Sequence, residues 1–181
     1  MYSASTLTDS NKTNGELHSL LVSIGYDTFG IPIESVKEVI ELTDTTMVPM
    51  CDQVIRGVIN VRGSVIPVLD MQHRLMLKNP QPYNKYSCIV LYDFYDPSLD
   101  EVMSLGMLVS SVMSIQYINC TQLEDSPSFG ANIPRHFVWK MAKINNQLTI
   151  LLDMNSVLNI SEINAQLKSS QAEFFTRFCQ R

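Results

Sequence analysis

The chain carries one short pattern twice, and this internal repeat limits the possible folds more than any other feature. Residues 61–71 align without gaps with residues 144–154, and both segments end in Leu-Asp-Met. A second pair, residues 30–36 and 106–112, also matches. Two copies are too few for a solenoid, so we expect two small β-units packed on each other. A double β-unit without catalytic groups indicates a docking protein rather than an enzyme.

The repeated unit has the pattern of a β-hairpin. Residues 58–61 and 64–69 are rich in Val and Ile and predict two short strands. Arg62 and Gly63 lie between them as a tight turn, where glycine accepts the positive φ that hairpin turns require. In the second copy Asn145 and Asn146 occupy the turn, and asparagine is the next most tolerant residue. Pro67 lacks a backbone donor and therefore favours an edge position or a bulge.

Several polar residues are placed to cap short helices. Asp70 and Asp153 each follow a strand and precede a partly apolar stretch, so we expect them to be N-caps, with a catalytic carboxylate as the alternative. Ser35 and Glu38 have the spacing of a capping box, which predicts a helical turn over residues 36–40.

The remaining pattern predicts a mainly β chain with three parts. Residues 1–15 have almost nothing to bury and are predicted to be a disordered tail. Residues 16–160 form the β domain, and residues 161–181 a C-terminal amphipathic helix that packs on the body or, alternatively, binds a partner. The further expected strands cover residues 17–24, 29–33, 87–94, 105–112, 137–144 and 148–152, with an acidic loop at 95–101, longer loops at 44–52 and 123–134, and a link between the copies at 78–85.

Composition excludes several classes of protein. A formal net charge of −5 argues against nucleic acid as the main partner. The four cysteines are irregularly spaced, so reduced thiols are expected rather than disulfides. The first residues show neither a signal peptide nor an apolar run long enough to span a membrane, so we expect a cytoplasmic protein without direct membrane insertion.

Signals for catalysis or cofactor binding are weak. The three histidines are far apart and have no metal-ligand spacing with cysteine or carboxylate, so no metal or other cofactor is expected. Phosphate-binding loops and nucleophile-elbow motifs are also missing from the sequence. Cys51 with a distant histidine is the remaining candidate nucleophile, and nothing near it supports that chemistry.

Residues 55–70 read Ile-Arg-Gly-Val-Ile-Asn-Val-Arg-Gly-Ser-Val-Ile-Pro-Val-Leu-Asp. This ungapped run resembles the signature motif of the CheW-like adaptor family of bacterial chemosensory systems. Upstream, residues 26–40 resemble the first strand pair of that family and its Val-x-Glu-Val-Ile segment, and Pro49 falls where the family has a proline. The resemblance covers about residues 17–160 and fades in the second half.

The resemblance implies two intertwined five-stranded SH3-like β-barrels with short helices. It also implies a non-catalytic adaptor that couples the cytoplasmic tips of chemoreceptors to the regulatory domain of a CheA-like histidine kinase, in arrays at the inner membrane. A length of 181 residues leaves no room after Met154 for the receiver domain that some members carry. The alternative is a CheW-like module that regulates pili, biofilm or second-messenger output, because fold does not determine partner.

The resemblance also implies a binding surface. We expect Glu38 and Arg62 to pair and to shape a surface for the kinase or receptor. The alternative is a solvated pair worth about 0–1 kcal/mol. Val36 and Val39, with Ile33, are candidates for an apolar contact, although such residues more often belong to a core. The predicted kinase- and receptor-binding set is Val36, Glu38, Val39, Arg56, Gly57, Arg62 and Gly63.

The second half departs from the family pattern at two positions. Ser110 stands where the family often has aspartate, and Lys140 stands at the equivalent of Gly57. Trp139, the single tryptophan, lies beside Lys140. These departures leave the expected fold intact and concern the choice of kinase and receptors and the working of the groove between the barrels.

Overall fold

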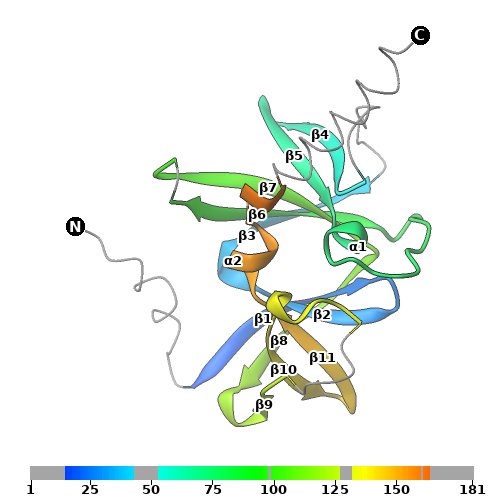
Figure 1. The fold of residues 1–181 in the computed structure, drawn as a ribbon, viewed down its shortest axis with the longest axis vertical. Coiled ribbons are helices and arrows are strands. Elements are labelled where there is room, and N and C mark those ends of the chain that lie inside the picture. Colours follow the sequence, from blue (N-terminus) through cyan, green and yellow to red (C-terminus); the bar gives the residue numbers. More distant parts are fainter. Residues whose placement is uncertain (1–14, 43–52, 98, 127–131, 160, 164–181) are drawn as a thin grey trace.

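The computed structural model describes residues 15–42, 53–97, 99–126, 132–159 and 161–163. These residues are mostly β-strand, as predicted (Figure 1). The strands are β1 (Glu16–Ile24), β2 (Asp27–Pro32), β3 (Val36–Glu41), β4 (Ile55–Val61), β5 (Ser64–Asp70), β6 (Cys88–Asp96), β7 (Glu101–Val109), β8 (Ser111–Asn119), β9 (Leu123–Glu124), β10 (Val138–Ile144) and β11 (Gln147–Leu152). The short helices are α1 (Met71–Arg74) and α2 (Met154–Val157), with 3-10 turns at Ile33–Ser35, Cys120–Gln122 and Arg135–Phe137.

The described strands form two sheets that exchange segments of the chain. One has five strands in the order β3-β6-β7-β5-β4, and the other has six in the order β8-β1-β2-β11-β10-β9. The five-stranded sheet lies in the upper part of Figure 1 and the six-stranded sheet in the lower part. β1 and β2 from the start of the chain join β8–β11 from its end, so the two units are intertwined. The six-stranded sheet exceeds the predicted five strands by the two-residue strand β9.

The structure confirms the repeat at the level of strand register. Gly30 of β2 lies opposite Leu151 of β11, and Gly106 of β7 lies opposite Val68 of β5, both in parallel pairs. A Cβ atom at Gly30 would lie 2.5 Å from Leu151 Cδ2, and one at Gly106 would lie 2.8 Å from Ile89 Cγ2. Glycine is therefore favoured at both positions, because a Cβ atom there would force the neighbouring side chain to shift.

Three apolar clusters hold the sheets together. The largest lies between the two units and combines residues from both, among them Phe29, Leu69, Met107 and Phe137. Each sheet also curls around a smaller cluster of its own. In the five-stranded sheet this comprises Ile59, Ile66, Val68, Ile89, Leu91 and Leu108, and in the six-stranded sheet Ile118, Ala142 and Leu151. At about 1.5–3 kcal/mol for each large buried side chain, the shared cluster makes the largest contribution to joining the units.

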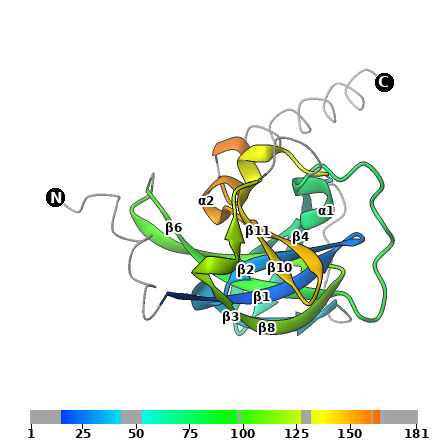
Figure 2. The same ribbon diagram turned by 90° about the horizontal axis from the view of Figure 1, so that it is seen from below.

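The helix that follows each copy begins at the predicted cap. Asp70 accepts the backbone N–H groups of Gln72 and His73, and Asp153 accepts those of Asn155 and Ser156. Both aspartates therefore satisfy donors that the first helical turn leaves free. Figure 2 shows α1 and α2 on the same side of the sheets.

Arg74 joins the two copies at this point. It aligns with Val157 in the repeat, and its Nε atom donates to the Val157 carbonyl at 2.7 Å. Its terminal nitrogens donate to the Ser156 carbonyl at 3.0 Å and to the Glu162 carboxylate at 3.2–3.3 Å. The guanidinium also lies 4.8 Å from the centre of the Phe137 ring. The acceptors and the aromatic ring that contact this fully buried guanidinium thus all come from the second half of the chain.

Two sequence predictions are wrong. The predicted capping box at Ser35 is absent, and residues 36–40 belong to β3 rather than to a helical turn. Pairing with β6 supplies the backbone partners of this Val- and Ile-containing segment, so a long-range ladder replaces the local cap. The strand predicted over residues 105–112 breaks at Ser110, and the nine-residue strand β8 that follows was not predicted. The Ser110 hydroxyl accepts the N–H of Gly25 at this break.

The predicted link between the copies is bound to the body of the protein. The Gln72 side chain exchanges two hydrogen bonds with the backbone of Gln81, at 2.6 and 2.8 Å. The predicted hairpin at the second copy is confirmed as β10 and β11. The predicted N-terminal tail lies outside the described residues except for Gly15, and so does the C-terminal helix beyond residues 161–163, which are helical. Cys51 and Pro49 also lie outside the described residues.

Candidate docking surface

The β4–β5 turn places Arg62 in a backbone conformation that arginine seldom adopts. Arg62 has a φ of 51° and Gly63 a φ of 87°, and Asn60 Oδ1 accepts the Gly63 N–H at 2.9 Å. Glycine is suited to this conformation, whereas a residue with a Cβ loses roughly 1 kcal/mol or more. The backbone therefore explains Gly63, but it does not explain an arginine at position 62, which points to a role for the arginine side chain.

The Arg62 side chain forms the predicted pair with Glu38. Arg62 Nη2 lies 2.9 Å from Glu38 Oε2. The Arg62 side chain is 83 % exposed and that of Glu38 32 % exposed. At this exposure the pair itself contributes about 0–1 kcal/mol to stability.

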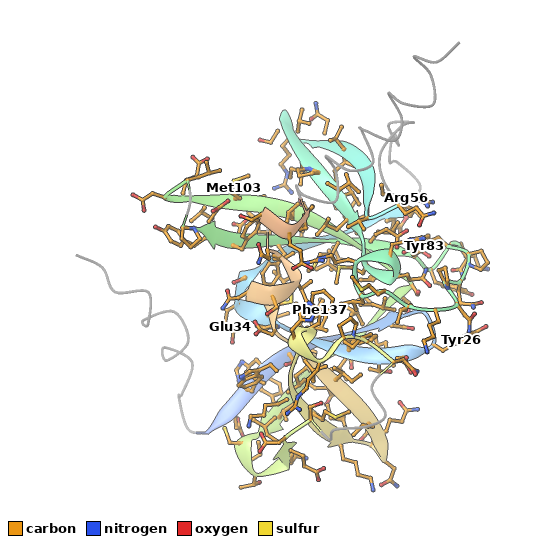
Figure 3. All side chains as sticks on the ribbon, viewed as in Figure 1. Tyr26, Glu34, Arg56, Tyr83, Met103 and Phe137 are labelled. Atoms are coloured by element: carbon orange, nitrogen blue, oxygen red, sulfur yellow. The ribbon has the colours of Figure 1, made fainter. Side chains whose placement is uncertain are left out.

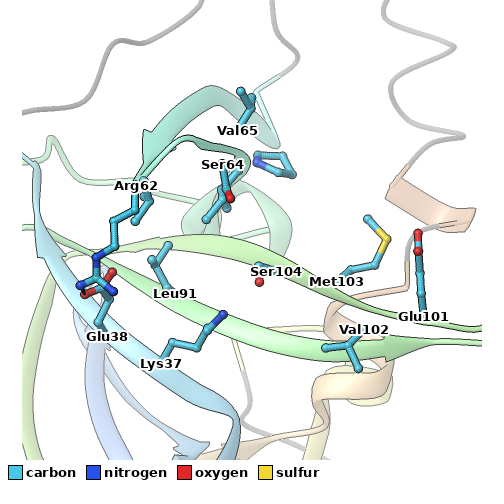
Figure 4. A pocket seen from close by; sticks show the side chains of 13 residues that line it. Lys37, Glu38, Arg62, Ser64, Val65, Leu91, Glu101, Val102, Met103 and Ser104 are labelled. Carbon is cyan, nitrogen blue, oxygen red and sulfur yellow. Dashed lines mark hydrogen bonds and ion pairs between the residues drawn. The ribbon is translucent and has the colours of Figure 1, made fainter.

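This pair stands at one end of a groove of about 530 Å³ (Figure 4). The groove lies between the β4–β5 hairpin and β7, with Leu91 of β6 also in its lining. Glu101, Val102 and Met103 lie at the end away from the ion pair. Its lining is Lys37, Glu38, Val61, Arg62, Ser64, Val65, Ile66, Pro67, Leu91, Glu101, Val102, Met103 and Ser104.

Polar groups of β3, β6 and β7 are paired with one another. Lys37 Nζ lies 3.4 Å from Asp93 Oδ2, and the Ser104 hydroxyl donates to Asp93 Oδ1. With the Glu38–Arg62 pair, these contacts occupy both cations that line the groove.

A β-bulge divides the predicted binding residues between two faces of β3. Val36 lies opposite Tyr92, Glu38 opposite Leu91 and Val39 opposite Val90, with the register shift at Lys37. Val36 and Val39 therefore face the side of the cluster between the units, and Glu38 faces the groove. Val36 packs against that cluster, whereas Val39 is 43 % exposed.

Arg56 and Gly57 lie at the other end of β4 from Arg62, where the register shifts again. Gly57 has a φ of 145° there. The Arg56 guanidinium lies 5.5 Å from the centre of the Tyr83 ring and 3.8 Å from Asp70 Oδ2. Figure 3 shows Arg56 beside Tyr83 and far from Met103. The structure thus brings Glu38, Arg62 and Gly63 together and leaves Arg56 and Gly57 apart from them.

Asp70 is a buried centre of hydrogen bonds as well as a cap. The Tyr83 hydroxyl donates to Asp70 Oδ1 at 2.6 Å, and Arg56 provides a nearby positive charge. Burial, followed by the Asp70 charge, raises the pKa of Tyr83 well above its usual range. Tyr83 therefore keeps the proton that it donates, and Asp70 fixes the link between the copies to α1.

Metal binding finds no support among the residues that the structure describes. No cluster of three or more His, Cys, Asp or Glu side chains in that part of the chain could hold an ion. Within the same ranges, none of the helices is long and apolar enough to cross a bilayer.

Sequence reasoning missed an exposed apolar stripe on β8. Met113, Ile115 and Tyr117 are each more than half exposed, and Tyr117 packs edge-on against His18 at 4.4 Å between ring centres. The signal was the alternation of apolar and polar residues from 113 to 117, which is typical of a strand with one distinct face.

A family model described as the CheW-like domain matches residues 18–162. The chain belongs to the CheW-like family. It is 27 % identical over 155 residues to the "Chemotaxis protein CheW" of Rhizobium meliloti, covering 84 % of this chain and 94 % of that protein. It is 27 % identical over 156 residues to the protein of the same name from Thermotoga maritima, covering 84 % and 93 %.

A solved structure supports the same fold. The scaffolding protein TtCheW of Thermoanaerobacter tengcongensis superposes with a TM-score of 0.64 at 26 % identity, covering 76 % of this chain and 88 % of that one. The predicted CheW-like family, the SH3-like β fold and the adaptor class in chemotaxis are thereby confirmed.

Proposed function

We propose that this chain is a non-catalytic adaptor that docks on the regulatory domain of a CheA-like histidine kinase through the Glu38–Arg62 face, and that it also contacts the cytoplasmic tips of chemoreceptors. The observation that carries the proposal is the ion pair at the end of the groove. Membership of the CheW-like family supports the class of partner.

Arg62 is the residue best placed to contact the kinase. Arg62 adopts a positive φ, which is an unfavourable backbone conformation for a residue with a Cβ atom. Its guanidinium is largely exposed, and Glu38 holds that guanidinium at the end of the groove. A planar guanidinium offers several donors in a fixed geometry, so one edge can stay on Glu38 while another binds a partner. Val39 adds exposed apolar surface on the opposite face of β3, where the receptor contact is proposed.

The cellular setting belongs to the same proposal. An adaptor between receptor tips and a kinase works on the cytoplasmic side of the inner membrane, in association with receptor arrays. The residues predicted for binding but distant from the groove, Arg56 and Gly57, support the hairpin and the Asp70 centre in this proposal rather than the partner contact.

The test is binding of the purified protein to the regulatory domain of each CheA-like kinase of the source cell. We expect micromolar or tighter binding to one kinase, about −8 kcal/mol at 1 μM. Arg62→Glu should weaken it at least tenfold, because it places like charges at positions 38 and 62 and removes the donor from the face. Arg135→Glu, an exposed change of the same charge outside the groove, is the matched control.

Two outcomes would contradict the proposal. Equal affinities of Arg62→Glu and Arg135→Glu would remove Arg62 from the interface. Absence of binding to every kinase would exclude the kinase as a direct partner. Where the wild type binds and Arg62→Glu does not, the double variant E38R/R62E shows how the pair acts. Recovery of kinase binding would mean that the ion pair shapes the surface. Failure to recover would mean that Arg62 itself contacts the kinase.

A further inference from the structure

The hairpin formed by β6 and β7 is longer than its counterpart in the repeat. In β1 and β2, Ile24 lies opposite Asp27, so two residues make the turn. In β6 and β7 the equivalent pair is Phe94 and Met103, with eight residues between them. The extra residues form an arm, described at residues 93–97 and 99–104, that projects beyond the rest of the five-stranded sheet (Figure 1).

The arm has an unpaired edge along the groove. The parallel ladder between β5 and β7 begins only at Val68 and Gly106. Residues 101–105 of β7 and 64–67 of β5 therefore face each other across the groove without pairing. Pro67 lies in this part of β5, where the edge facing β7 is unpaired, as predicted for a residue without a backbone donor. From Val68 onward β5 pairs with both β4 and β7 and is an interior strand. A gap of this kind between two strand edges can accept one further strand.

The surface chemistry of the arm favours a cationic apolar partner. Of the carboxylates in the arm, Asp100 and Glu101 are exposed, Asp93 is half-buried and Asp96 is buried, and the arm contains no lysine or arginine. The Tyr95 hydroxyl donates to Asp100. No ion-pair partner of Glu101 is found within the described ranges, whereas Asp93 is paired with Lys37. Val102 on the arm and Val65 on the opposite hairpin are each 67 % exposed. A native edge is usually protected by charge or covered, and here the apolar side chains on both walls remain uncovered.

We infer that this arm is a docking element that binds an extended, positively charged segment of a partner protein, which pairs as a strand with the unpaired edge of β7 along the groove. Residues 101–105 accommodate about five residues of such a segment, roughly 16 Å long. Its cationic side chains lie on the face of β7 that carries Glu101, and its alternate apolar side chains pack on Val102, which points to the opposite face. The inference rests on the proposed function only in that the segment would belong to a partner seated on the Glu38–Arg62 face.

The first test uses a synthetic probe and backbone amide chemical shifts of the full chain. The probe is an acetylated, amidated hexapeptide of alternating lysine and valine, and the comparison peptide has glutamate in place of lysine. We expect shifts confined to residues 64–66 and 101–105 with the lysine peptide and none with the glutamate peptide. Shifts spread over other acidic surfaces, or equal binding of both peptides, would overturn the inference.

Two variants locate the binding energy. Glu101→Lys should weaken the lysine peptide at least fivefold relative to Glu16→Lys, an exposed charge reversal on β1 that serves as control. Replacing residues 95–102 by the Gly25-Tyr26 turn of the first copy should abolish binding. Equal effects of the two charge reversals would overturn the inference even where the shortened hairpin does not fold.

Parallel measurements with the kinase regulatory domain separate the two proposals. If Arg62→Glu loses kinase binding while Glu101→Lys retains it and the peptide does not bind the arm, the arm inference fails and the proposed function stands. If the peptide binds the arm while the wild-type chain binds no kinase, the proposed function fails and the arm remains a docking element for another partner.

Discussion

In the five-stranded sheet, Glu38 lies opposite Leu91 on β3 and pairs with Arg62 in the β4–β5 turn. In the six-stranded sheet the repeat places Ser114, opposite Leu21, and Asn145 at the equivalent positions. Both sheets keep the bulge, the two-residue turn with positive φ and the parallel pair at glycine. The backbone plan is therefore shared, and the charged surface and the arm belong to one unit alone.

The two capping aspartates differ in the same way. Asp153 accepts from its own helix, including the Ser156 hydroxyl, and is partly exposed. Asp70 is fully buried and also accepts from Tyr83, with Arg56 nearby. One repeated residue thus serves as a simple cap in one copy and as a structural centre in the other, because the link after α1 folds back over Asp70.

The largest expected effect on stability comes from removing the contacts that Arg74 makes between the two copies. Arg74→Ala leaves the carbonyls of Ser156 and Val157 without their donor and removes a buried side chain, so we expect a loss of about 2–4 kcal/mol in the free energy of unfolding. Urea denaturation measures it, with Arg135→Ala as the exposed control expected within about 0.5 kcal/mol of wild type. A loss below 1 kcal/mol would show that the shared apolar cluster joins the units without Arg74.

The repeated glycines give the next effect and a direct comparison of the sheets. Gly106→Ala should lower the free energy of unfolding by about 1–3 kcal/mol, because its Cβ meets the branched side chains of Ile89 and Val68 at 2.8 and 3.2 Å. Gly30→Ala should cost less, since the nearest atom is the movable end of Leu151. Both are measured by urea denaturation. A greater loss at Gly30 would mean that the six-stranded sheet is the more tightly packed of the two.

The smallest effect concerns Tyr83 and alkaline pH. Its pKa is raised in the folded protein from an ordinary value of 10.0, so above pH 10 the unfolded chain releases this proton while the folded chain retains it. Stability contributed by Tyr83 is therefore present below pH 10 and is lost as pH rises. Tyr83→Phe should be less stable than wild type at pH 8 and should lose less stability between pH 9 and 11.

Tyr117→Phe, which alters an exposed ring on β8, is the control for that titration. Denaturant unfolding at each pH provides the free energies. Parallel curves for wild type and Tyr83→Phe across this range would contradict the assignment of Tyr83 as the proton donor to Asp70.

The sequence by itself determined the local features of this protein. The turn at Gly63 and the turn at Asn145 and Asn146 follow from which residues accept positive φ, and the caps at Asp70 and Asp153 follow from the donors at a helix start. The repeat and the family motif extended these local signals to the whole chain. Such features are readable because each depends on a few adjacent residues.

Only the tertiary structure decided which strands pair across the repeat and which side of each strand faces the groove. β2 pairs with β11 and β5 with β7, so partners come from distant parts of the chain, and their choice depends on closing both sheets around a shared core. In a regular strand Val36 and Glu38 would point to the same face, because side chains alternate with a period of two residues. The bulge at Lys37 places them on opposite faces, with Val39 on the face of Val36. Register and bulges arise from contacts between strands that are distant in the sequence, and for that reason the groove and the arm could not be located from the sequence.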